Sequence, residues 1–173
     1  KEGAEGLLTS LRTAVSAGEH LPAETWRAVH ERTGLKLVNG IGATEMLHVF
    51  ISAAGDDIRT GATGTAVPGY RATILDEDGR ELGPNAVGRL AVIGPTGCRY
   101  LNDSRQADYV VDGWNVTGDT FSRDEDGYFY YQARSDNMIV SSGYNIGAPE
   151  VEAAIDQHPD VMENAVVGRP DAD

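Results

Sequence analysis

The sequence predicts a mixed α/β protein in three successive parts: the end of an α/β sheet subdomain, an antiparallel β-barrel-like portion, and the beginning of a small α+β domain. Three observations lead to this prediction. The first third carries an amphipathic helix pattern followed by a short apolar run. The middle carries short alternating runs separated by glycines, and the pattern changes again after residue 135.

The first predicted element is a helix in LPAETWRAVHERTG, residues 21–34. Pro22 suits the first turn of a helix, and Gly34 suits its end. The face expected to point inward holds Trp26, Val29 and His30. The run LKLV, residues 35–38, then predicts a short strand.

A glycine-containing turn is predicted next, in NGIGATEMLH, residues 39–48. Two interpretations of its polar residues are open. Thr44 and Glu45 place a hydroxyl beside a carboxylate, which together can hold Mg²⁺ and a phosphate oxygen. Alternatively, Thr44 caps the start of a helix and Glu45 interacts favourably with the helix dipole.

The middle of the chain predicts antiparallel strands, because apolar and polar residues alternate between turn residues. The expected strands cover residues 70–75, 88–94, 107–111 and 128–132. The sequence DEDG occurs at 76–79 and again at 124–127. Each copy is expected to close a hairpin, with Gly79 and Gly127 at positive φ.

Two further polar groups stand out in this half of the chain. Asp119 lies in WNVTGDT, which predicts a turn whose carboxylate could accept both hydroxyls of a ribose, although TGD is also an ordinary turn sequence. Arg134 lies where the pattern changes and either binds a phosphate or ribose or pairs with a neighbouring carboxylate. Beyond it, a helix is predicted in residues 148–159 and a strand in 162–168.

Composition excludes several classes of function. Acidic residues outnumber basic ones by 27 to 14, giving a net charge of -13, which argues against nucleic acid or an anionic membrane as a partner. Cys98 is the single cysteine, so no disulfide framework is expected and a cytoplasmic setting is predicted. No apolar run reaches the ~18 residues of a membrane span. Because the chain starts without Met and ends abruptly, we expect it to be a piece of a longer protein.

The motifs together carry a resemblance that none carries alone. In order, SAGEHLP, GIGATE, GTAVPG, GRLAVIGP, VTGDT, ARSDNMIVSSGYNI and PEVE resemble the adenylate-forming enzymes, over nearly the whole chain. GATEMLHVF and SSGYNIGAPEVE are most similar to benzoate- and aminobenzoate-CoA ligases. The resemblance implies that residues 1–135 end the large domain, with an α/β portion at 1–57 and a β-rich portion at 58–135. Residues 136–173 would be the hinge and the beginning of the small domain.

Such enzymes join a carboxylic acid to the α-phosphate of ATP, release pyrophosphate, and pass the acyl group from the adenylate to CoA. The resemblance therefore implies ATP, Mg²⁺ and CoA as cofactors and a small aromatic carboxylic acid as substrate. Catalytic roles would fall to Thr44, at the phosphate, and to Glu45, as the Mg²⁺ ligand. Asp119 and Arg134 would hold the ribose hydroxyls.

The remaining roles also follow from the resemblance. The stretch 16–19 would line the adenine and acyl sites, with Gly18 and Glu19 at the nucleotide and Ala17 at the acyl group. Gly42 would bind the cofactor and also form a wall of the acyl pocket. The other expected pocket residues are Ala43, Met46 and His48, of which His48 is equally well explained as an ordinary, partly buried histidine. Asp136 would be the hinge residue, and Gly143 would border the pantetheine channel.

Some features depart from the family. Ile41 stands where the family commonly has a tyrosine that stacks on adenine. The family's phosphate loop is missing, and the two lysines, Lys1 and Lys36, do not correspond to the lysine that supports adenylation. The isolated chain is therefore expected to be a poor catalyst or inactive. A peptide-synthetase adenylation domain and a non-catalytic nucleotide-binding fragment are the alternatives.

Overall fold

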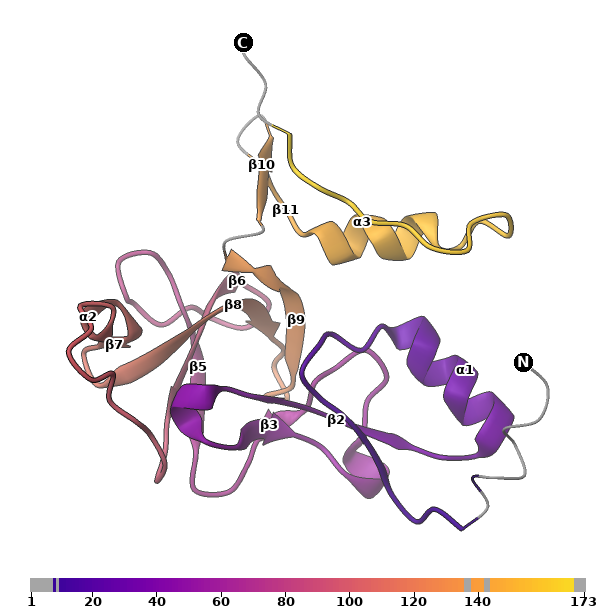
Figure 1. Ribbon diagram of the computed structural model, residues 1–173, viewed down its shortest axis with the longest axis horizontal. Helices are drawn as coiled ribbons and strands as arrows, with labels where there is room; N and C mark the ends of the chain where they lie inside the picture. Colours follow the sequence, from indigo (N-terminus) through magenta and orange to yellow (C-terminus); the bar gives the residue numbers. More distant parts are fainter. Residues whose placement is uncertain (1–7, 9, 136–137, 142–143, 170–173) are drawn as a thin grey trace.

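The computed structural model describes residues 8, 10–135, 138–141 and 144–169. Its strands form a four-stranded sheet, a five-stranded sheet and a two-stranded hairpin. The hairpin and the last helix lie beyond the end of the five-stranded sheet, while the first helix lies beside the four-stranded sheet (Figure 1). The mixed α/β prediction is confirmed.

The first sheet has the order β1-β2-β3-β4, with β1 parallel to β2 and the other neighbours antiparallel. Its strands are β1 (Ala14–Ser16), β2 (Leu37–Gly42), β3 (Val49–Ser52) and β4 (Thr65–Ala66). Strand β1 was not predicted, because its three residues are too short to show an alternating pattern. A parallel pair requires a crossover connection, and the helix between β1 and β2 provides it.

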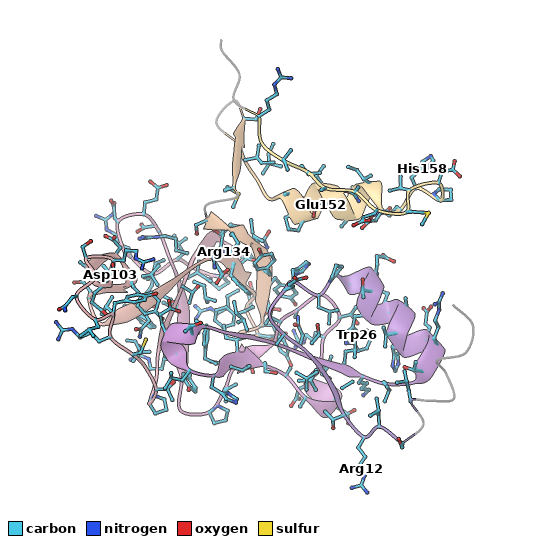
Figure 2. All side chains as sticks on the ribbon, in the orientation of Figure 1. Arg12, Trp26, Asp103, Arg134, Glu152 and His158 are labelled. Carbon is cyan, nitrogen blue, oxygen red and sulfur yellow. The ribbon has the colours of Figure 1, made fainter. Side chains whose placement is uncertain are left out.

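That helix, α1 (Ala23–Thr33), confirms the first predicted element. Pro22 is the N-cap residue, and Gly34 ends the helix in the left-handed conformation with φ 71°. The predicted inward face is half-buried. Trp26 lies on the side of α1 toward β2, where its Nε1 donates a hydrogen bond to the carbonyl of Leu37 at 2.8 Å (Figure 2).

The stretch 39–48 differs from its prediction in two ways. Strand β2 continues through Gly42, so residues 39–42 are strand and not turn. A Cβ at Gly42 would lie 2.6 Å from the carbonyl oxygen of His48, so the close pairing of β2 with β3 requires glycine there. The turn follows as one 3₁₀ turn, η2 (Thr44–Met46), whose N-cap is Ala43. Capping by Thr44 is therefore wrong.

The second sheet is antiparallel throughout and has the order β5-β6-β8-β7, with β9 paired to the second half of β8. Its strands are β5 (Arg71–Leu75), β6 (Val87–Ile93), β7 (Val110–Val111), β8 (Trp114–Arg123) and β9 (Phe129–Arg134). An antiparallel bridge between Gly64 and Phe129 brings β9 back to the first sheet. This curling gives the barrel-like shape that the alternating runs predicted.

Both predicted turns are present. Gly79 has φ 82° and Gly127 has φ 87°. The turn at 124–127 joins β8 to β9. The turn at 76–79 closes a smaller loop, in which Leu75 bridges to Glu81 before the chain continues to β6.

Two predictions in this region are wrong. Residues 107–111 do not form one strand: the helical turn α2 (Gln106–Tyr109) precedes the two-residue β7. TGD is not a turn between strands but the middle of β8, where Gly118 has φ 78° and the pairing with β6 shifts register. A local bulge of this kind re-aims the next side chain, and Asp119 is that side chain.

The C-terminal part begins with a hairpin that was not predicted, β10 (Ile139–Ser141) and β11 (Tyr144–Ile146). Helix α3 (Ala148–Ile155) confirms the next prediction, with Pro149 in its first turn. The predicted strand at 162–168 is wrong, because no described strand lies beside it to complete a ladder. It runs along α3 instead, where the N–H of Val166 donates to Oε1 of Glu152 at 2.8 Å.

One hydrophobic core joins the two larger sheets. It contains Met46, Phe50, Ile51, Ile74, Leu90, Val92, Phe121 and Phe129. Because these residues come from both sides of residue 57, the predicted α/β and β-rich portions share a core. A short 3₁₀ turn, η3 (Gly55–Asp57), lies at the surface between them. Within the described ranges, no helix is long and apolar enough to cross a membrane.

Candidate nucleotide site

A cavity of about 400 Å³ lies where the loop after β1 meets β2, β8 and β9. Five residues that the sequence predicted at a nucleotide site line it: Gly18, Glu19, Gly42, Asp119 and Arg134. The chain separation between the first and last of these exceeds half the sequence, so the fold brings them together. Sequence reasoning gave no role to six further lining residues: His20, Asn39, Gly40, Thr63, Phe121 and Tyr131.

The polar wall of the cavity is a pair of charged residues on neighbouring strands. Asp119 of β8 is directly opposite Arg134 of β9 in the ladder, and Nη1 of Arg134 lies 3.2 Å from Oδ1 of Asp119. Asp119 is 8 % exposed, whereas Arg134 is open to solvent. The expectation that Arg134 pairs with a carboxylate is confirmed, and the pair itself faces the cavity.

Gly118 makes this arrangement possible. A Cβ at residue 118 would lie 3.3 Å from Nη2 of Arg134, so the guanidinium lies across the glycine. The positive φ of Gly118 also sets the bulge that directs Asp119 inward. The sequence showed a glycine before an acidic residue at this position, but it did not show that both residues lie within a strand.

Aromatic side chains also line the cavity. The ring of His20 stacks on Tyr131 with a centroid distance of 4.9 Å, and Tyr131 meets the buried Phe121 edge-on at 5.5 Å. Burial lowers the pKa of His20, and the negative charge of Glu152 opposes that shift. Glu152 belongs to α3 (Figure 2), so the C-terminal part acts electrostatically on this part of the cavity.

Thr44 and Glu45 lie outside the cavity lining, in η2. The Thr44 side chain is exposed, and Glu45 is half-buried. The hydroxyl of Tyr100 donates a hydrogen bond to Oε1 of Glu45. This bond raises the pKa of the Tyr100 phenol, and burial and the Glu45 charge raise it further.

The residues present fit a magnesium ion that is held partly by the protein and partly by the phosphates of a bound nucleotide. Within the described residues, no group of three or more His, Cys, Asp or Glu side chains could enclose a metal. Mg²⁺ commonly takes one or two carboxylates together with substrate phosphates and waters. A single half-buried carboxylate such as Glu45, whose described hydrogen bond uses Oε1, is suited to that task.

The other predicted site residues are more scattered. Ala17 and His48 are exposed, so the view of His48 as a partly buried histidine is wrong. Ala43 packs against the core and Met46 is fully buried within it. Asp136 and Gly143 lie outside the described residues. The roles of all these residues stay predictions.

A family model described as AMP-binding enzyme matches residues 1–100, which is more than half of the chain. The chain belongs to the AMP-binding enzyme family. The matched residues include β1, α1, the β2–β3 pair and the Thr44-Glu45 turn, and they end before α2, so the match does not reach the strand that carries Asp119.

Individual relatives agree with the family. The chain is 40 % identical over 166 residues to benzoate–CoA ligase of Thauera aromatica, a match covering 94 % of this chain and 32 % of that enzyme. The crystal structure of the anthranilate CoA ligase AuaEII with anthranoyl-AMP superposes with a TM-score of 0.88 at 38 % identity, covering 94 % of this chain and 32 % of that one. The crystal structure of ATP-bound MatB from Rhodopseudomonas palustris superposes with a TM-score of 0.91 at 32 % identity, covering 97 % of this chain and 34 % of that one. The chain thus spans about a third of these relatives' length.

Proposed function

We propose that this chain is the nucleotide-binding part of an ATP-dependent ligase that activates a small aromatic carboxylic acid as its adenylate and transfers the acyl group to CoA. The cavity carries the proposal, because residues from four separate segments that the motifs predicted at a nucleotide meet in it. The named activities of the benzoate and anthranilate ligases support the aromatic acid and CoA.

The chemistry of the cavity suits a ribose. The carboxylate of Asp119 can accept hydrogen bonds from two adjacent hydroxyls, and the bond from Arg134 orients that carboxylate. Gly18 has φ 94°, with no atom within 4 Å of the position of a Cβ, so a ligand can approach its backbone closely. Phe121 and Tyr131 form an apolar wall on which a planar group can lie.

The acid-activation step would draw on η2. Thr44 would donate its hydroxyl to a phosphate oxygen, and Glu45 would hold magnesium. When bound, magnesium would neutralise charge on the phosphates during attack by the carboxylate. The aromatic acid itself would lie near Gly42, which borders the cavity at the end of β2.

Nucleotide binding by the chain tests the first part of the proposal. Asp119→Asn should raise the dissociation constant for AMP about tenfold, because hydrogen bonds to charged groups contribute about 1.5–3 kcal/mol. Asp126→Asn is the matched control: it removes a carboxylate that pairs with Arg59 at 2.9 Å at the surface. Calorimetric titration measures both. Equal AMP affinities for the two variants would show that Asp119 does not bind AMP.

The activity is tested by grafting. The chain replaces the matching third of the Thauera aromatica benzoate–CoA ligase, and the hybrid is assayed with ATP, CoA and a series of carboxylic acids. Formation of AMP and acyl-CoA with benzoate-like acids supports the proposal. Adenylate formation without transfer to CoA favours a peptide-synthetase type of acceptor. A folded hybrid that binds AMP but forms no adenylate favours a non-catalytic nucleotide-binding role.

A further inference from the structure

The turn that carries Glu45 is strained, and the segment after β6 holds it in place. Leu47 ends η2 with φ 63°, a conformation that is uncommon for a bulky side chain and persists only where its surroundings fix it. Thr96, in the segment after β6, donates its hydroxyl to the carbonyl of Met46 at 2.5 Å. Since that proton is used, the hydroxyl of Tyr70 donates to Thr96, at 2.6 Å.

The same segment also holds the Glu45 side chain. The phenol of Tyr100 donates to Oε1 of Glu45. Tyr100 is itself restrained, because its backbone N–H donates to Oε1 of Gln106 at 2.8 Å. Its ring meets that of Tyr109 edge-on at 6.0 Å, and the guanidinium carbon of Arg105 lies 5.4 Å from its centroid. The donor that reaches Glu45 is therefore fixed on several sides.

We propose that Tyr100 is a positioning residue: by occupying Oε1 of Glu45 it fixes the carboxylate so that Oε2 is presented to a nucleotide-bound divalent cation. The inference rests on the proposed function, since it takes Glu45 as the metal ligand. Hydrogen bonds to metal-ligating carboxylates orient them, and their loss weakens metal affinity. The segment after β6 therefore holds both the η2 turn and the side-chain carboxylate of Glu45, so one segment aligns the two.

The test separates the affinity for ATP without metal from the increase in ATP affinity that a divalent cation causes. ATP affinity of the full 173-residue chain is measured with EDTA and with Mn²⁺, and bound Mn²⁺ is counted by electron paramagnetic resonance. Tyr100→Phe should leave the affinity in EDTA unchanged and reduce the Mn²⁺-dependent increase about tenfold. Tyr128→Phe is the control, because it also removes one hydroxyl, which donates to the carbonyl of Asp57 at 2.8 Å away from η2.

A double-mutant cycle shows whether Tyr100 acts through Glu45. Glu45→Gln should abolish most of the Mn²⁺-dependent increase, and adding Tyr100→Phe to it should change nothing further. A further loss in the double variant, or a Tyr100→Phe chain that responds to Mn²⁺ as Tyr128→Phe does, overturns the positioning role. Failure of the unmodified chain to bind ATP even in EDTA overturns the proposed function instead.

Discussion

Gly118→Ala tests how the bulge in β8 controls the cavity. Gly118 has φ 78° and Gly79, in the surface turn after β5, has φ 82°. An alanine in this left-handed region costs about 1–2 kcal/mol. Both Gly118→Ala and Gly79→Ala should therefore lower the free energy of unfolding by about that amount, which makes Gly79→Ala a control for backbone strain.

The two glycines differ in what a Cβ would meet. At Gly79 no atom lies within 4 Å, whereas at Gly118 Nη2 of Arg134 lies at 3.3 Å. The guanidinium is the end of a flexible side chain, so it can move by a few tenths of an ångström with little further loss of stability. However, its bond to Asp119 is already 3.2 Å long, at the upper limit of an ordinary N–H···O bond. The displacement should break this bond.

The expected effect on binding follows from that bond. A charged pair that is partly open to solvent contributes up to about 1 kcal/mol, which corresponds to about a fivefold change in the dissociation constant. Gly118→Ala should bind AMP about fivefold more weakly than Gly79→Ala. Urea unfolding followed by tryptophan fluorescence measures stability, and calorimetric titration measures AMP affinity. Equal affinity in the two variants would refute the dependence of Arg134 on the glycine.

Two other predictions concern titratable groups whose pKa the fold shifts. Tyr109→Phe should raise the free energy of unfolding by about 1 kcal/mol, because its buried hydroxyl has no hydrogen-bond partner within the described part of the chain; an unchanged or lower urea midpoint contradicts this. The pKa of His20 is lowered, chiefly by burial, so the unfolded chain binds this proton more tightly and stability should rise with pH up to about 6.5. Glu152→Gln should lower the pKa of His20 further, which an NMR titration of its ring checks. An unaltered titration would show that α3 does not act on the cavity wall.

Local sequence signals identified the elements that carry their own start and stop residues. Helix α1 has Pro22 before it and Gly34 after it, and both act within a few residues along the chain. The turns at Gly79 and Gly127 were predictable for the same reason, since a glycine after acidic residues specifies φ without help from distant contacts. The candidate nucleotide residues were found through motif order, which needs no knowledge of distance.

The errors arise where distant pairing decides the local structure. Residues 39–42 look like a turn because they contain two glycines, but β3 lies so close that Gly42 is required within a strand. The TGD stretch looks like a turn for the same reason, yet β6 and β9 extend β8 through it. Residues 162–168 contain the apolar run Ala165–Val167 that a strand could use, but such a run forms no ladder without a neighbouring strand.

The sequence by itself determined the family, the mixed α/β class, the acidic charge and the polar groups available to a nucleotide, because these depend on residue types and their order. Only the tertiary structure decided which groups act together. The bulge at Gly118 turns Asp119 toward Arg134, and Tyr100 reaches Glu45 across 55 residues of chain. These contacts depend on strand register and on the curl of one sheet against another, which are properties of the packed core and of no single stretch of sequence.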